Sequence, residues 1–167
     1  MGRIMTIMAA GRLTASALSS LTGCNTSGCT DLQSSIPLAG LYSSASQQPI
    51  TVSTLEIYGV VAPNDSILYD GGTALREVYL PLRSDFTTTA FCFHYTQEGL
   101  DDEALNDTIT FHYTSEPYFA SEECGAMYRY TITRLAYTQH LIDSVAVTDS
   151  LVANTDFERL KIYFRTE

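Results

Sequence analysis

The sequence has no tryptophan and a single lysine, Lys161, among its 167 residues. Nine basic residues stand against 19 acidic ones, which gives a formal net charge of −10 at pH 7. A field of this sign repels phosphate backbones and anionic lipid surfaces. The composition therefore argues against nucleic-acid binding and against a basic patch of the phosphate- or heparin-binding type.

Motifs of known catalytic sites are lacking as well. The sequence has no Gly-x-Ser-x-Gly nucleophile elbow, no zinc-protease helix motif and no glycine-rich phosphate loop. His140 stands beside an expected turn, and we interpret it as a surface residue. A catalytic triad assembled only by folding would leave no such spacing. We expect a protein without enzymatic activity and without a cofactor.

Long apolar runs and helical periodicity are absent from residue 24 onward. A transmembrane helix needs about 20 predominantly apolar residues, and no segment of this part of the sequence has them. No period of 3.6 residues is sustained there either. The sequence therefore predicts neither a spanning helix nor a helical domain.

The segment that is present at the N-terminus resembles an export signal. Arg3 and Arg12 are the only charges in the first 30 residues, and an apolar stretch follows Arg12 and ends in Leu-Thr-Gly-Cys. Positive residues, an apolar core and a small-residue end are typical of a signal peptide. The last four residues have the pattern of a bacterial lipobox. Residues 1–23 are therefore predicted to be a lipoprotein signal peptide and Cys24 the acylated first residue; a buried N-terminal helix is the alternative.

Acylation at Cys24 would decide the location of the protein. Two or more acyl chains, at about 0.8 kcal/mol per buried methylene, anchor a protein stably to a membrane. Residues 24–30 are small and polar enough for a lipidated tether, and residues 31–167 have the length of a single domain. The sequence after Cys24 lacks the acidic cluster that often directs surface export. We expect an outer-membrane lipoprotein of a bacterial cell envelope that faces the periplasm.

Alternation of apolar and polar residues dominates the rest of the sequence. Aromatic and β-branched residues are enriched, as half-buried strands require. Eight or nine short strands, separated by turn signals about every 8–12 residues, are typical of a β-sandwich or barrel. We predict an all-β fold, an antiparallel β-sandwich of immunoglobulin-like or related type. The expected strands are 36–42, 51–61, 67–69, 75–82, 88–96, 108–115, 127–133, 141–147 and 160–164.

Two segments in the second half resemble a known family. Residues 107–113, DTITFHY, and 118–125, YFASEECG, resemble the central signature of an uncharacterised lipoprotein family, a domain of unknown function, of Bacteroidales-type bacteria. The sequence departs from this family's pattern at 30–42. The resemblance implies a cellular location and a fold but no activity. Shorter segments that fit the same pattern are 28–30, 80–82 and 142–145.

Three cysteines besides Cys24 are expected in the exported chain, namely Cys29, Cys92 and Cys124. Disulfides persist outside the cytoplasm, so one bridge and one free thiol are expected, although all three can stay reduced; the residues themselves leave three pairings open. Family members carry one cysteine just after the tether and another in a Ser-Glu-x-Cys-Gly turn. The resemblance therefore implies a Cys29–Cys124 disulfide. In the chain-entropy model, the loop that a Cys29–Cys124 bridge closes would stabilise the folded protein by at most about 4.7 kcal/mol.

The hairpin expected from 88–96 and 108–115 offers an alternative function. Its core side should carry Phe91, Phe93, Tyr95, Ile109, Phe111 and Tyr113. If Tyr95 pairs with Ile109, three potential ligands of zinc or copper lie close together on the outer side. These ligands are Cys92, His94 and His112. The simpler interpretation is that Cys92 is a buried apolar residue without a metal.

The acidic connection 101–107 could bind calcium through its oxygen atoms. It lacks the alternating acidic spacing and the fixed glycine of an EF-hand loop. We interpret it as a solvated hairpin loop, and we interpret the acidic residues near Pro117 in the same way.

Taken together, these features predict a membrane-anchored cell-envelope lipoprotein that acts as a non-catalytic binding or assembly module. The expected partners are the lipid bilayer, through acylated Cys24, and an envelope protein or a glycan. The 11 tyrosines suit such a partner surface. The alternative is a metal-binding envelope protein that uses Cys92, His94 and His112 or the acidic loop 101–107.

Overall fold

The computed structural model describes residues 35–60, 66–122 and 124–166. The expected signal peptide 1–23 and tether 24–30, with Cys24 and Cys29, lie outside these residues. In the described part of the chain we find ten strands and one short 3-10 helix. None of its helices has the length and apolar character needed to cross a membrane.

Each predicted segment overlaps a strand, although several bounds differ, and one strand, β9, was not predicted because it is too short to give a periodic signal. The short helix η1 (Glu103–Leu105) lies in the acidic connection. The strands are β1 (Leu38–Ser43), β2 (Leu55–Val60), β3 (Ile67–Asp70), β4 (Glu77–Tyr79), β5 (Thr88–Tyr95), β6 (Asp107–Ser121), β7 (Gly125–Tyr137), β8 (Ile142–Val147), β9 (Leu151–Val152) and β10 (Glu158–Phe164).

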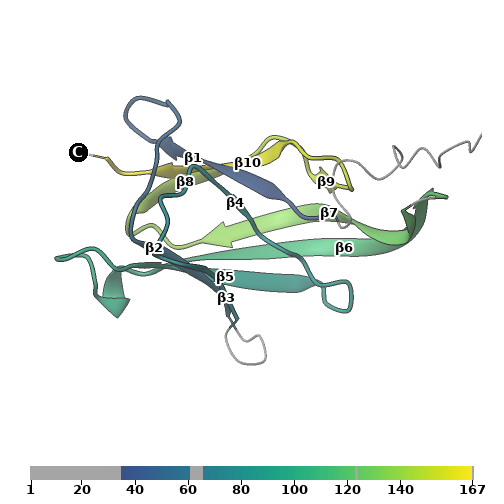
Figure 1. Cartoon of the computed structure of the whole chain (residues 1–167), viewed down its shortest axis with the longest axis horizontal. Coiled ribbons are helices and arrows are strands. Elements are labelled where there is room, and N and C mark those ends of the chain that lie inside the picture. Colours follow the sequence, from purple (N-terminus) through teal and green to yellow (C-terminus); the bar gives the residue numbers. More distant parts are fainter. Residues whose placement is uncertain (1–34, 61–65, 123, 167) are drawn as a thin grey trace, which may run out of the picture.

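Two sheets pack against each other, which confirms the all-β sandwich (Figure 1). Four of the strands form one sheet in the order β4-β1-β10-β8, and the other six form the second in the order β3-β2-β5-β6-β7-β9. The prediction of purely antiparallel sheets is wrong at one pair, because β1 and β10 run parallel. A parallel pair needs a long crossover connection, and here the whole chain between β1 and β10 provides it.

Side chains of both sheets meet in one apolar core. The predicted core side of the β5–β6 hairpin is confirmed, since all six of its side chains are buried. The four-stranded sheet contributes Leu41, Val78, Leu160 and Ile162, which are almost completely buried. The aromatic rings of Phe91 and Phe111 meet edge to face, with centroids 5.9 Å apart, an arrangement that aromatic pairs prefer.

Strands β6 and β7 are longer than predicted and run past the other strands (Figure 1). We call the paired residues 115–121 and 125–130 the arm. The predicted strand ended at Ser115, before Pro117, because proline cannot donate a ladder hydrogen bond. In the described chain β5 pairs with β6 only as far as His112. Pro117 therefore lies where β6 has become an edge strand, and there a missing N–H is tolerated.

Candidate functional site

The β5–β6 hairpin does not bring the predicted metal ligands together. Phe91 pairs with Ile109, and Cys92 pairs with Thr108. The predicted pairing of Tyr95 with Ile109 is therefore wrong by four residues. A shift by an even number keeps every side chain on its own face, so the alternating pattern fixes the faces but not the register.

The three residues Cys92, His94 and His112 have separate surroundings. Cys92 is a free thiol, 6% exposed, and its burial raises its pKa. Nδ1 of His94 lies 2.9 Å from Oδ1 of Asn106. Nδ1 of His112 lies 3.3 Å from the hydroxyl of Thr88. Among the described residues no three histidine, cysteine, aspartate or glutamate side chains lie close enough to hold a metal ion.

The carboxylates of the acidic loop also point in different directions. Asp101 lies 3.4 Å from Nε2 of His94. Asp102 caps helix η1, because its Oδ1 accepts a hydrogen bond from the backbone N–H of Ala104. Asp107 is completely buried. The loop therefore does not assemble a calcium cage from these three groups.

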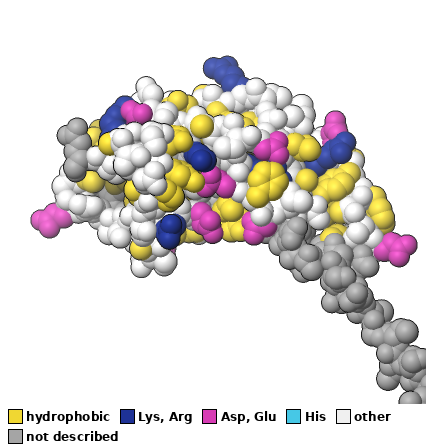
Figure 2. All heavy atoms as spheres, turned by 90° about the horizontal axis from the view of Figure 1, so that it is seen from above, with side chains coloured by type: hydrophobic (Ala, Val, Ile, Leu, Met, Phe, Trp, Pro, Cys, Tyr) yellow, Lys and Arg dark blue, Asp and Glu magenta, His cyan; other side chains and the backbone are white. Residues whose placement is uncertain are grey.

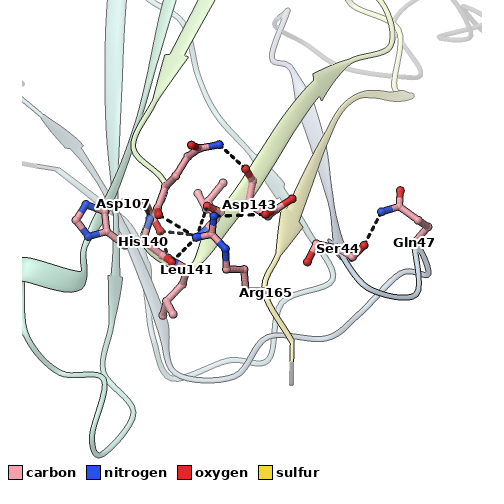
Figure 3. A network of polar contacts seen from close by, with 9 residues as sticks. Ser44, Gln47, Asp107, His140, Leu141, Asp143 and Arg165 are labelled. Atoms are coloured by element: carbon pink, nitrogen blue, oxygen red, sulfur yellow. Dashed lines mark hydrogen bonds and ion pairs between the residues drawn. The ribbon is translucent and has the colours of Figure 1, made fainter.

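Asp107 is instead the acceptor of a buried hydrogen-bond network (Figure 3). Its carboxylate accepts hydrogen bonds from the hydroxyls of Tyr95 and Thr138, at 2.9 and 2.8 Å. It also accepts from the backbone N–H groups of His140, Leu141 and Ile142, each at 2.8 Å. A carboxylate with five donors has no lone pair left for proton transfer. Its role is to hold the β7–β8 connection on β6.

Arg165 holds the same connection from the other side (Figure 3). Its Nη1 donates to the carbonyls of Gln139, His140 and Ile142. Its Nη2 lies 3.4 Å from the carboxylate of Asp143. The side chain of His140 is exposed, as predicted. These groups stabilise a turn and show no arrangement of nucleophile and base.

Among the described residues, a cavity of about 330 Å³ at one end of the sandwich is the candidate site with the most apolar lining. It lies between the loop 81–87 and the first residues of β5, next to β2 and β3. Its lining is predominantly apolar and includes Leu68, Pro81, Leu82, Phe86, Ala90 and Phe91. Small-molecule sites in proteins have volumes of about 300–1,000 Å³ and mostly apolar linings. The cavity therefore suits a small apolar group.

The wall of this cavity is fixed by the hydroxyl of Tyr113. The backbone N–H of Arg83 donates to this hydroxyl, and the hydroxyl donates to the carbonyl of Arg83, at 3.1 and 2.9 Å. It also lies 2.7 Å from the hydroxyl of Thr89 on β5. The hydroxyl of Ser115 donates to the carbonyl of Ser84. The loop 81–87 is thus tied to the sheet, and the cavity is pre-formed.

The guanidinium of Arg83 stands beside this cavity. It lies over the ring of Phe86, 3.7 Å from the centroid, and 3.9 Å from the carboxylate of Asp85. Exposed ion pairs of this kind contribute only about 0–1 kcal/mol. An anionic group of a ligand could therefore replace Asp85 as the partner of Arg83.

The sequence indicated only part of this site. The segment 80–82 fits the pattern of the family that the sequence resembles, but no local pattern places it beside Leu68 and Phe91. Leu82, Phe86 and Leu68 belong to a loop and a short edge strand, where alternation is too brief to indicate burial. Their convergence depends on the pairing of β2 with β3 and β5.

Cys124 lies at the tip of the arm and is disulfide-bonded. Cys92 is free, so pairings between Cys92 and Cys124 or Cys29 are excluded. No disulfide joins two of the described residues. The implied partner, Cys29, lies outside them, and the Cys29–Cys124 pairing stays a prediction.

Comparison with known proteins identifies the family. The profile of a family of unknown function, DUF6452, matches residues 54–164, which include β2 to β10. Searches of curated proteins and of solved structures found no match.

Proposed function

The chain belongs to DUF6452, a family of unknown function, and we propose that it is a lipid-anchored binding module of a bacterial cell envelope. In this proposal, Cys24 carries the acyl chains and the domain takes up the apolar group of a small anionic amphiphile. The pre-formed apolar cavity beside Arg83 is the observation that carries the proposal.

The proposed cellular location is inferred from sequence motifs. The lipobox at residues 21–24 follows an arginine-headed apolar segment, which supports export and acylation. The resemblance of 107–113 and 118–125 supports a Bacteroidales-type source, and the lack of an acidic cluster after Cys24 supports the periplasmic side of the outer membrane. We propose that the module is non-catalytic, because the polar clusters around Asp107 and Arg165 serve as hydrogen-bonded supports.

The lining favours an amphiphile over a glycan or a polar peptide. Sugar hydroxyls need many hydrogen-bond partners, and a polar group that is buried without one costs about 1–3 kcal/mol. Leu68, Leu82 and Phe91 offer none through their side chains. Arg83 supplies one positive charge beside the cavity, where the head group of an amphiphile would lie. The chemistry of the lining therefore matches a single alkyl or aryl group with an anionic end.

The test uses 1-anilinonaphthalene-8-sulfonate as a fluorescent probe, with decanoate as its competitor, on the folded protein. Leu68→Gln places a polar amide in the lining, and we expect at least about tenfold weaker binding of the probe, since about 1.4 kcal/mol corresponds to a factor of ten. Decanoate is expected to displace the probe from the unchanged protein.

Ile67→Gln is the matched control, because Ile67 is the adjacent residue of β3, is 59% exposed and does not line this cavity. It should bind the probe as the unchanged protein does. Urea unfolding of both variants separates lost binding from lost folding. Equal binding by the Leu68 and Ile67 variants, both folded, would contradict the proposed site.

A further inference from the structure

The arm carries the most exposed large apolar side chain of the described residues, Phe119, which is 68% exposed. Tyr128 on the opposite strand is 45% exposed. In the β6–β7 ladder Phe119 pairs with Ala126, and Pro117 pairs with Tyr128. Directly paired residues share one face of a ladder, and these pairs are two residues apart. The arm therefore presents one apolar face that is exposed.

This face lies at a defined end of the molecule. Figure 1 shows the arm projecting from the end of the sandwich at which β1 begins. Seen from above, that end of the surface has hydrophobic side chains interspersed with basic and acidic ones (Figure 2). Arg129 of the arm pairs with Glu116 at 3.0 Å. Glu116 and Arg129 are the neighbours of Pro117 and Tyr128 along their strands, so this ion pair lies on the opposite face of the arm from Phe119. The face with Phe119 and Tyr128 is separate from these charges, and an exposed tyrosine is typical of interfacial belts at membrane surfaces.

The short tether between Cys24 and Cys29 limits the distance between the tip of the arm and the proposed anchor. Cys124 at the tip is disulfide-bonded, and Cys92 is free, so with Cys24 acylated the remaining partner is Cys29. Five residue steps separate Cys29 from Cys24, and an extended chain covers at most about 18 Å in five steps. A strand of 15 residues, such as β6, is about 50 Å long. With Cys24 acylated and Cys29 bridged to Cys124, the tip of the arm is therefore held close to the acylated cysteine, and the far end of β6 is not.

We propose that the arm rests on the lipid surface, with Phe119 and Tyr128 in the headgroup region beside the acylated Cys24. This inference deepens the proposed function, and it rests on the acylation of Cys24 that the proposed function includes. The lipid bilayer is the favoured partner of this face. A short tether that is bridged to the tip of the arm holds the apolar face at the membrane, whether or not a protein partner is present.

The absence of tryptophan from the sequence allows a single-fluorophore test. Phe119→Trp places the reporter on the arm, and Ala45→Trp places a matched control on the exposed turn after β1, at the opposite end of the molecule (Figure 1). Both acylated full-length proteins are reconstituted in phosphatidylcholine vesicles with brominated acyl chains. We expect about twofold quenching of the reporter on the arm and almost none of the control.

A third variant, Phe119→Trp with Cys29→Ser, removes the proposed bridge and lengthens the free tether. Its quenching should fall toward that of the Ala45 control, and thermal unfolding shows whether the fold is kept. Acylated protein whose two reporters are quenched equally would overturn the inference and leave the proposed anchor intact. If the reporter on the arm is not quenched in vesicles but is protected from acrylamide in native membranes, a protein partner is indicated and the inference is also overturned.

The mass of the purified protein is measured before reconstitution. A chain without acyl groups would contradict the proposed anchor and this inference together, and that readout is independent of the quenching.

Discussion

At the scale of single residues, the position of Asp107 is decided by its donors. It is the first residue of β6 and fully buried, and five hydrogen bonds join it to Tyr95, Thr138 and the backbone of 140–142. Buried charges are tolerated where hydrogen bonds replace water. The sequence showed this residue only as the last member of an acidic run, because its donors come from segments far along the chain.

Replacement of Asp107 by asparagine should destabilise the protein strongly. An amide has one acceptor oxygen, so two or three donors lose their partner, and each costs about 1–3 kcal/mol. We expect the free energy of unfolding to fall by about 3 kcal/mol, measured by urea denaturation. Asp101→Asn, at an exposed position, should change it by less than about 0.5 kcal/mol. Equal effects of the two changes would show that the network is not a main support.

At the scale of elements, Arg159 holds the short strand β9 in place. Its side chain is 2% exposed and lies over the ring of Phe157, 3.9 Å from the centroid. Its guanidinium donates to the carboxylate of Asp149 at 2.9 Å, to the carbonyl of Leu151 and to the hydroxyl of Thr155 at 2.6 Å. Burial lowers the pKa of Arg159, and Asp149 opposes this shift. A two-residue strand thus persists because one side chain fixes the loop around it.

Arg159→Lys is expected to loosen this edge of the sheet. An ammonium group cannot reproduce the planar fork, and it loses its proton more readily than guanidinium when buried. We expect a loss of about 2 kcal/mol in urea unfolding and faster amide exchange at Ile132, whose N–H donates to the carbonyl of Ser150. Arg134→Lys, at an exposed position of β7, is the control. Unchanged exchange at Ile132 in the Arg159 variant would contradict this role.

At the scale of the whole molecule, the cysteines connect the fold to its proposed anchor. Cys92 is buried and free, and Cys124 is disulfide-bonded. A bridge from Cys29 to Cys124 would fix the tip of the arm to the beginning of the chain, outside the core. Because this bridge closes a long loop, we expect it to stabilise the protein mainly by lowering the conformational entropy of the unfolded chain.

Alkylation followed by mass measurement tests this arrangement. Without reductant the folded protein should react slowly, because burial raises the pKa of Cys92 and the thiolate is the reactive form. Urea without reductant should expose one thiol, and reductant should expose three, with a loss of stability of about 2–5 kcal/mol. A Cys92→Ala variant should show no thiol before reduction. Three reactive thiols in unreduced, unfolded protein would contradict the bridge.

The sequence by itself determined the fold class, the approximate positions of the strands and the face of each side chain in the β5–β6 hairpin. These follow from alternation, which is local and has a period of two residues. Only the tertiary structure decided the register of that hairpin, the parallel β1–β10 pair, the length of the arm and the cavity beside Arg83. Each of them depends on which distant segments pair, because an even shift in register changes every neighbour and no face.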